Sequence, residues 1–228
     1  MKNIITLIIS GILLSCAPGD ATEEIFQDST DKIENHEVKN SSFDYGNAKS
    51  GIYTNDYFNF EIKFDTSWSI QSQKQLNGIV EQGKRMLNDN SGLEKAIEAA
   101  EINTAYLFAM FKHEMGAPVS FNPSLIILAE NTKRMKGVKQ GKDYLFHARE
   151  NLKQTKLNYT FDQDYGSKKY AAYNFDILTA HLNGYTTPIT QKYITTVIGN
   201  FTLSFIISYS TEEEKQELYQ VLESMKKK

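Results

Sequence analysis

The chain has 228 residues, of which 25 are basic and 28 acidic, so its formal net charge at neutral pH is −3. This near balance argues against a nucleic-acid partner, because such proteins carry a clear positive excess. With Cys16 as its single cysteine, the chain has no internal disulfide. Phe and Tyr each occur 13 times, which favours a sheet-containing fold over a helical bundle.

The first residues have the pattern of a secretory signal peptide. Lys2 supplies a positive start, an apolar core runs from Ile4 to Leu14, and a small residue precedes Cys16. The core is shorter than the ~20 residues that a membrane-spanning helix needs. The sequence Leu13-Leu14-Ser15-Cys16 resembles the lipobox of bacterial lipoproteins. The alternative is a buried cysteine at the end of an ordinary apolar helix.

The lipobox resemblance implies cleavage after residue 15 and acylation of Cys16, which would then bind membrane lipid through its acyl chains. Two or three such chains anchor a protein durably without a spanning helix. Ala17, where inner-membrane lipoproteins have Asp, implies sorting to the outer membrane. Whether the periplasmic or the surface face is occupied stays open. With Cys16 acylated, no thiol is left as a nucleophile or metal ligand.

The composition changes after the cysteine. Between residues 17 and 50, eight acidic residues stand against three lysines, with few apolar residues among them. Such a segment cannot bury enough surface to offset its ordering entropy. We therefore predict a lipidated, disordered tether over residues 16–50, with a reach of roughly 30 Å as a flexible coil. A short amphipathic helix near Glu23 to Ile33 is the alternative. Residues 51–228, with 21 basic and 20 acidic side chains, form the predicted domain.

The first half of this domain alternates between strand and helix patterns. Residues 57–64 place Phe58, Phe60, Ile62 and Phe64 on one face, which predicts a half-buried strand, and Trp68 is expected to close the same core. Apolar spacing predicts a helix over 72–87, and a capping box of Ser91 and Glu94 predicts a second helix over 91–102. The apolar runs 106–111 and 125–129 are expected to pair as buried strands. The basic stretch 131–141 is read as a solvated loop, with an anion site as the alternative.

The second half contains the clearest patterns. A helix is predicted over 142–156, and strands over 157–161, 169–180 and 189–198. Gly199-Asn200 is a hairpin signal before an alternating strand, 201–209. Thr211 and Glu214 form a capping box for a terminal helix, whose negative end Lys226 to Lys228 would complement.

These elements predict an α+β domain in which helices pack on an antiparallel sheet. The segment from Tyr53 to Trp68 resembles the opening of PsbP-like domains, where an aromatic strand runs into a turn and a tryptophan. Residues 193–214 also match this family in kind. The resemblance implies a PsbP-like α/β/α sandwich of an uncharacterised bacterial branch, used for binding or assembly. The family's proline before the tryptophan is absent here, which argues against a photosynthetic role.

No catalytic, metal or cofactor-binding residue is predicted. The histidines are His36, His113, His147 and His181, and no two of them have metal-ligand spacing. His147 and Glu150 share a helix face, and we interpret them as a surface pair, with half of a metal site as the alternative. Six tyrosines are candidates either for a ligand-binding sheet face or for ordinary packing: Tyr159, Tyr165, Tyr170, Tyr173, Tyr185 and Tyr193.

The sequence therefore favours a non-catalytic binding or assembly module, held on the extracytoplasmic side and recognising a protein or a glycan. This expectation rests on the lipobox and on the lack of a thiol, a histidine cluster or a nucleophile motif. The alternative is an extracytoplasmic hydrolase built from carboxylates with His113, His147 or His181.

Overall fold

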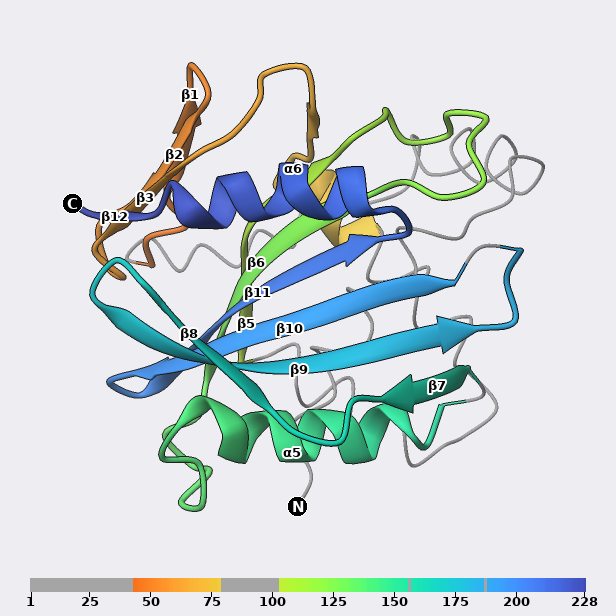
Figure 1. Ribbon diagram of the computed structural model, residues 1–228. Coiled ribbons are helices and arrows are strands. Elements are labelled where there is room, and N and C mark those ends of the chain that lie inside the picture. Colours follow the sequence, from red (N-terminus) through yellow and green to blue (C-terminus); the bar gives the residue numbers. More distant parts are fainter. Residues whose placement is uncertain (1–42, 79–102, 156, 187) are drawn as a thin grey trace, which may run out of the picture.

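The computed structural model describes residues 43–78, 103–155, 157–186 and 188–228. Of these residues, 44% lie in strands and 19% in helices. The strands form a large and a small antiparallel sheet, and helices lie on opposite faces of the large one (Figure 1). Within the described ranges, no helix is long and apolar enough to cross a membrane. Cys16, most of the predicted tether and most of the predicted helices 72–87 and 91–102 lie outside these ranges.

The large sheet has the strand order β4-β5-β6-β11-β10-β9-β7, and β8 pairs with β9. Every pairing in it is antiparallel. Its strands are β4 (Ser69–Ile70), β5 (Thr104–Phe111), β6 (Ser124–Asn131), β7 (Asn158–Phe161), β8 (Gly166–Tyr170), β9 (Tyr173–Asn183), β10 (Ile189–Ile198) and β11 (Phe201–Tyr209).

The small sheet has the order β1-β2-β3-β12 and joins the two ends of the domain. Its strands are β1 (Asn47–Lys49), β2 (Ile52–Asn55), β3 (Phe60–Lys63) and β12 (Lys226–Lys227). Two helices complete the labelled elements: α5 (Gly141–Leu152) and α6 (Glu212–Glu223). Because β12 follows α6 directly, the last residues of the chain hold the small sheet beside that helix.

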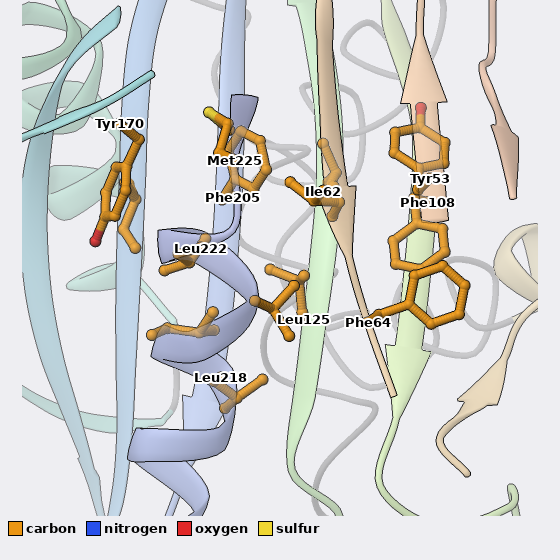
Figure 2. Close-up of a cluster of buried hydrophobic side chains, with 14 of the residues drawn as sticks. Tyr53, Ile62, Phe64, Phe108, Leu125, Tyr170, Phe205, Leu218, Leu222 and Met225 are labelled. Carbon is orange, nitrogen blue, oxygen red and sulfur yellow. The ribbon is translucent and has the colours of Figure 1, made fainter. Parts of the chain in front are cut away.

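The large sheet has an apolar core on each face. On one face, α5 buries Tyr144, Leu145, Ala148 and Leu152 against residues such as Tyr193, and we call this cluster the α5-side core. On the other face, α6 and the small sheet share a core with Phe205, which we call the α6-side core. Figure 2 shows Tyr53, Ile62, Leu218 and Leu222 in this core. Each side chain of this kind contributes roughly 1.5–3 kcal/mol when fully buried. The parts of the large sheet that these two cores do not cover are the parts that can contact solvent.

The predicted fold class is wrong. We expected an α+β domain of the PsbP-like α/β/α sandwich type, whereas the described part of the chain is a β-rich fold made mostly of antiparallel sheets. The physical reason is visible in the α6-side core. The aromatic strand that opens the domain pairs into a second sheet, and this sheet covers much of the face where a helical layer was expected.

Several predictions of local structure are confirmed. β5 and β6 pair, and β10 and β11 form a hairpin whose last pair is Ile198 with Phe201, around Gly199-Asn200. Thr211 caps α6, and its hydroxyl accepts a bond from the backbone N–H of Glu214 at 3.2 Å. Trp68 is 7% exposed, so it does close the core. The hairpin and the cap depend on neighbouring residues, which is why a local pattern sufficed for them.

Three element boundaries differ from prediction. The strand expected over 57–64 is shorter, because residues 56–59 turn between β2 and β3 with Asn59 at positive φ. The strand expected over 169–180 is a hairpin of β8 and β9, turning at Ala171 (φ 49) without the usual glycine. Lys226 and Lys227, expected to end the terminal helix, form β12 against β3.

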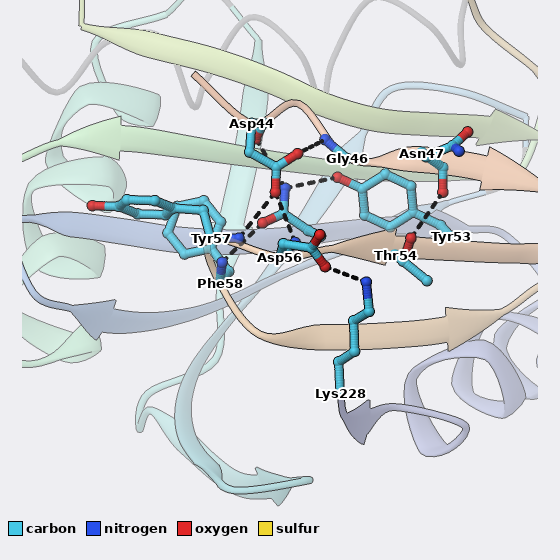
Figure 3. A network of polar contacts seen from close by, with 10 residues as sticks. Asp44, Gly46, Asn47, Tyr53, Thr54, Asp56, Tyr57, Phe58 and Lys228 are labelled. Atoms are coloured by element: carbon cyan, nitrogen blue, oxygen red, sulfur yellow. Dashed lines mark hydrogen bonds and ion pairs between the residues drawn. The ribbon is translucent and has the colours of Figure 1, made fainter. Parts of the chain in front are cut away.

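The predicted tether ends earlier than residue 50. Asp44 accepts three backbone N–H bonds through its carboxylate, from Gly46 at 2.8 Å, Asp56 at 2.7 Å and Tyr57 at 2.9 Å (Figure 3). β1 then pairs with β2. Residues 43–50 therefore belong to the folded domain, because one acidic side chain satisfies backbone donors that a turn would otherwise leave open.

Candidate functional site

β9 and β10 place polar side chains on the sheet face that α6 shares. The strand register sets Thr190 opposite His181 and Lys192 opposite Thr179. The side chains of these four residues lie on the same sheet face as Ile177 and Ile194, which belong to the α6-side core. Asp162, just after β7, joins the same group. We refer to Asp162, Thr179, His181, Thr190 and Lys192 as the polar face.

The members of the polar face bond to one another. The backbone N–H of Asp162 donates to the carbonyl of Thr179 at 3.2 Å, which fixes the loop against β9. Asp162 Oδ1 then lies 2.9 Å from His181 Nε2, and His181 Nδ1 lies 3.3 Å from Thr190 Oγ1. Beside this row, Lys192 Nζ donates to Thr179 Oγ1 at 3.3 Å. The sheet thus holds four types of polar group in a fixed arrangement.

The polar face is open to solvent and carries mixed charge. The side chains of His181 and Asp162 are 37% and 52% exposed. The hydrogen bond from His181 is the main cause that lowers the pKa of Asp162. Burial lowers the pKa of Lys192, Asp162 raises it, and Lys215 on α6 lowers it further. Asp162 therefore stays ionised at neutral pH and is not poised as a general acid.

This arrangement can present donors and acceptors to a ligand. Lys192 donates only, Asp162 accepts only, and the threonine hydroxyls and His181 do both. Such a set suits a ligand that carries hydroxyl, amide or carboxylate groups. Among the residues that the structure describes, no group of three or more His, Cys, Asp or Glu side chains could hold a metal ion.

The structure separates the histidines singled out in the sequence. His113 lies two residues after the end of β5, where its backbone N–H donates to Asn122 Oδ1 at 2.9 Å. His147 is on α5 with its ring against Phe146, whereas Glu150 pairs with Lys153 at 2.8 Å. The predicted pair of His147 and Glu150 is therefore wrong. Of the three described histidines, only His181 is part of a polar cluster, and His36 lies outside the described ranges.

The six tyrosines do not line one sheet face. Tyr193 is fully buried in the α5-side core, where Tyr159 and Tyr165 also pack. Tyr170 and Tyr173 belong to the α6-side core, and Tyr185 is 40% exposed between β9 and β10. The packing interpretation therefore holds for five of them.

A second polar group, which the sequence analysis missed, lies under α5. The Tyr144 hydroxyl donates to Glu130 Oε2, and Glu130 Oε1 has no hydrogen-bond partner. Glu130 is 0% exposed, and burial raises its pKa to about 8. The one sequence signal for a buried Glu130 was its position directly after the apolar run 125–129, which was predicted to be a buried strand. The pair is closed off from solvent, so it contributes to the core rather than to a surface site.

Comparisons with known proteins leave the family open. No protein-family model matches the chain, and no curated protein matches it. The chain is similar to a crystal structure from Bacteroides thetaiotaomicron VPI-5482, with 11% identity and a TM-score of 0.39. That match covers 75% of this chain and 45% of the other, so this chain spans less than half of that protein's length.

Proposed function

We propose that this protein is a lipoprotein acylated at Cys16 whose domain binds a protein or glycan partner on the extracytoplasmic side, and that this partner contacts the polar face. The observation that supports the proposal is the fixed row from Asp162 through His181 to Thr190, open to solvent on rigid strands. Sites of this kind lose little conformational entropy on binding, because the groups are already ordered.

The binding site is tested by capture in the native membrane. The lipidated protein is crosslinked, and the captured partner is identified by mass spectrometry. We expect the double variant His181→Ala/Lys192→Ala to lose the partner. The matched control is His147→Ala/Lys153→Ala, which removes the same residue types from α5 and its C-cap and should retain the partner. Equal capture by both variants would mean that the partner binds elsewhere.

The lipid anchor is tested separately. Intact-mass measurement of membrane-extracted protein should show the acyl addition, and fractionation should place the protein in the outer membrane, as Ala17 implies. A Cys16→Ser variant should lose both the added mass and stable membrane attachment. A variant that stays attached with an unchanged mass shift would exclude acylation at Cys16.

The second candidate function is an extracytoplasmic hydrolase. The observation in its favour is that Thr190 Oγ1, His181 and Asp162 follow one another as a hydroxyl, a base and a carboxylate would in nucleophilic catalysis. Against it, the row lies on an open strand face, whereas catalysis benefits from a site that excludes water. Thr190→Val separates the two functions: a hydrolase would lose turnover while keeping its substrate affinity, and a binding module would show no turnover to lose.

A further inference from the structure

The positive charge of the domain is concentrated around the start of α5. Residues 131–142 contain five basic residues and no acidic residue, a net charge of +5. Because the whole chain is −3, the rest of it carries −8. One short segment is therefore strongly basic within an acidic protein, which is the distribution expected of a surface that meets an anionic partner.

The structure turns these cations outward. Thr132 is buried, and Met135 and Val138 pack into the α5-side core, so the loop before α5 is held against the domain. The basic residues around these anchors are exposed, and so is Lys142 in the first turn of α5. The exposed basic residues are Lys133, Arg134, Lys136, Lys139 and Lys142. We call these five residues the basic loop.

The basic loop has free positive charge. None of its five side chains forms an ion pair with any described residue. The nearest acid along the chain, Asp143, instead accepts the backbone N–H groups of Lys139 and Gln140 at 2.9 and 3.0 Å. Although partial burial opposes it, these bonds, together with the side chain of Gln140 and the nearby charge of Lys142, hold the pKa of Asp143 below its usual value.

The described chain begins at the same end of the sheet as the basic loop. The backbone N–H of Thr132, at the start of the loop, donates to the carbonyl of Asn200 in the β10–β11 turn at 2.8 Å. The ring of Phe201, the next residue, lies 5.9 Å from the ring of Phe43. The first described residue and the basic loop thus flank one turn, and Figure 1 shows that turn at the same end of the domain as the start of α5.

Aromatic side chains are exposed beside this turn. Phe43 contacts Tyr45 and Tyr57, which are 44% and 54% exposed. The carboxylates nearby already have partners: Asp44 accepts hydrogen bonds from backbone N–H groups, and Asp56 pairs with Lys228 (Figure 3). Tyrosines combine an apolar ring with a polar tip and are enriched at membrane–water interfaces.

We propose that the basic loop, together with Tyr45 and Tyr57, docks onto the anionic headgroups of membrane phospholipids. The lysines and Arg134 lie against lipid phosphates, and the tyrosine rings enter the interfacial layer. The proposal rests on the proposed function in one respect: an anchor at Cys16 keeps this end of the domain close to a membrane. Tethering makes the docking intramolecular, so a weak surface affinity suffices to orient the domain.

The docked orientation turns the start of α5 towards the membrane. The polar face lies on the opposite side of the large sheet from α5, beside α6. A partner could then reach the polar face without competing with the lipid surface. Docking therefore orients the domain so that the polar face stays accessible to a partner. The tether alone would not give this orientation.

The test uses the mature chain carrying Cys16→Ser, which has no acyl chain. Its sedimentation is measured with vesicles of phosphatidylcholine alone and of phosphatidylcholine with phosphatidylglycerol, at low and high salt. We expect binding to the anionic vesicles only, and loss of that binding at high salt. The triple variant Lys133→Glu/Arg134→Glu/Lys136→Glu should bind at least tenfold more weakly.

The matched control reverses three lysines that lie outside the basic loop, Lys74→Glu/Lys153→Glu/Lys215→Glu, and should bind within twofold of the parent. Thermal melts confirm that each variant is folded. Equal losses in both triple variants, or no preference for anionic vesicles, would overturn the proposal, as would binding to heparin without binding to vesicles. Failure of acylation at Cys16 would leave this assay unchanged, so the two hypotheses fail separately.

Discussion

Under α5, the carboxyl group of Glu130 is fully buried and bonds to Tyr144, whereas across the sheet Asp162 pairs with His181 in contact with solvent. Burial raises the pKa of Glu130 to about 8, and the hydrogen bond from His181 lowers the pKa of Asp162. The difference follows from what covers each face. A helix lies over the first carboxyl, and α6 leaves the second uncovered.

This comparison separates two uses of polar side chains in one sheet. A buried polar group is costly unless it is bonded, so the Glu130–Tyr144 pair has consequences for stability. An exposed pair adds little to stability, because water screens it. The polar face is therefore free to serve a ligand, and stability and binding should respond to different substitutions.

The largest expected effect is on the α6-side core that supports the polar face. Trp68→Ala removes a ring that is only 7% exposed and should cost ~3–5 kcal/mol in the free energy of unfolding. Denaturant melts measure the change. Ile70→Ala, at a side chain that is 40% exposed, is the control and should cost far less. A loss under about 1 kcal/mol for Trp68→Ala would mean that the ring does not support this core.

The next effect tests the buried carboxyl through pH. The pKa of Glu130 is raised from 4.5 to about 8 in the folded protein, so its contribution is complete below pH 4.5 and is lost as the pH rises towards 8. The stability of the parent should fall between pH 5 and pH 8 by on the order of 3 kcal/mol from this group. Glu130→Gln should remove that fall. Parallel stability curves for parent and variant would contradict the assignment.

A smaller effect is expected where α5 meets the sheet. A Cβ at Gly141 would lie 2.1 Å from the carbonyl oxygen of Thr195 and 3.0 Å from Asp176 Oδ2. Gly141→Ala should therefore displace the start of α5 and cost about 2–3 kcal/mol. Gly137→Ala is the matched control, because a Cβ there meets nothing within 4 Å. Equal melting temperatures for the two variants would show that α5 can shift without cost.

The smallest effect on stability is expected in the polar face. His181→Ala breaks an exposed pair with Asp162 and should change the free energy of unfolding by under about 1 kcal/mol. The same variant should lose partner capture, since His181 joins Asp162 to Thr190. A loss of stability comparable to that of Trp68→Ala would make His181 a structural residue and weaken the contrast between the two faces.

Where the structure departs from the sequence predictions, the cause is pairing between distant segments. The alternation of residues 57–64 correctly gave the buried positions Phe58, Phe60, Ile62 and Phe64. It could not give the partners of that strand, which are β2 and, from the other end of the chain, β12. The predicted helical layer failed for this reason. The β8–β9 turn at Ala171 was missed because it lacks the glycine that marks most tight turns.

The sequence by itself determined the features that neighbouring residues control. These are the hairpin at Gly199-Asn200, the cap of α6 at Thr211 and the extent of β11 over residues 201–209. Each depends on backbone conformations or side-chain periods within a few residues, so a local pattern suffices. The acylation of Cys16 belongs to this class of inference and stays a prediction, because that residue lies outside the described ranges.

Only the tertiary structure decided which ionisable groups meet. Asp162 and His181 are 19 residues apart, and Tyr144 and Glu130 are 14 apart, so no local pattern links them. Strand order brought the first pair together, and the packing of α5 on the sheet brought the second together. Whether each carboxyl is ionised then depends on what covers it. The physical reason is that burial and hydrogen bonding, which together shift these pKa values, are properties of the folded structure and not of the chain.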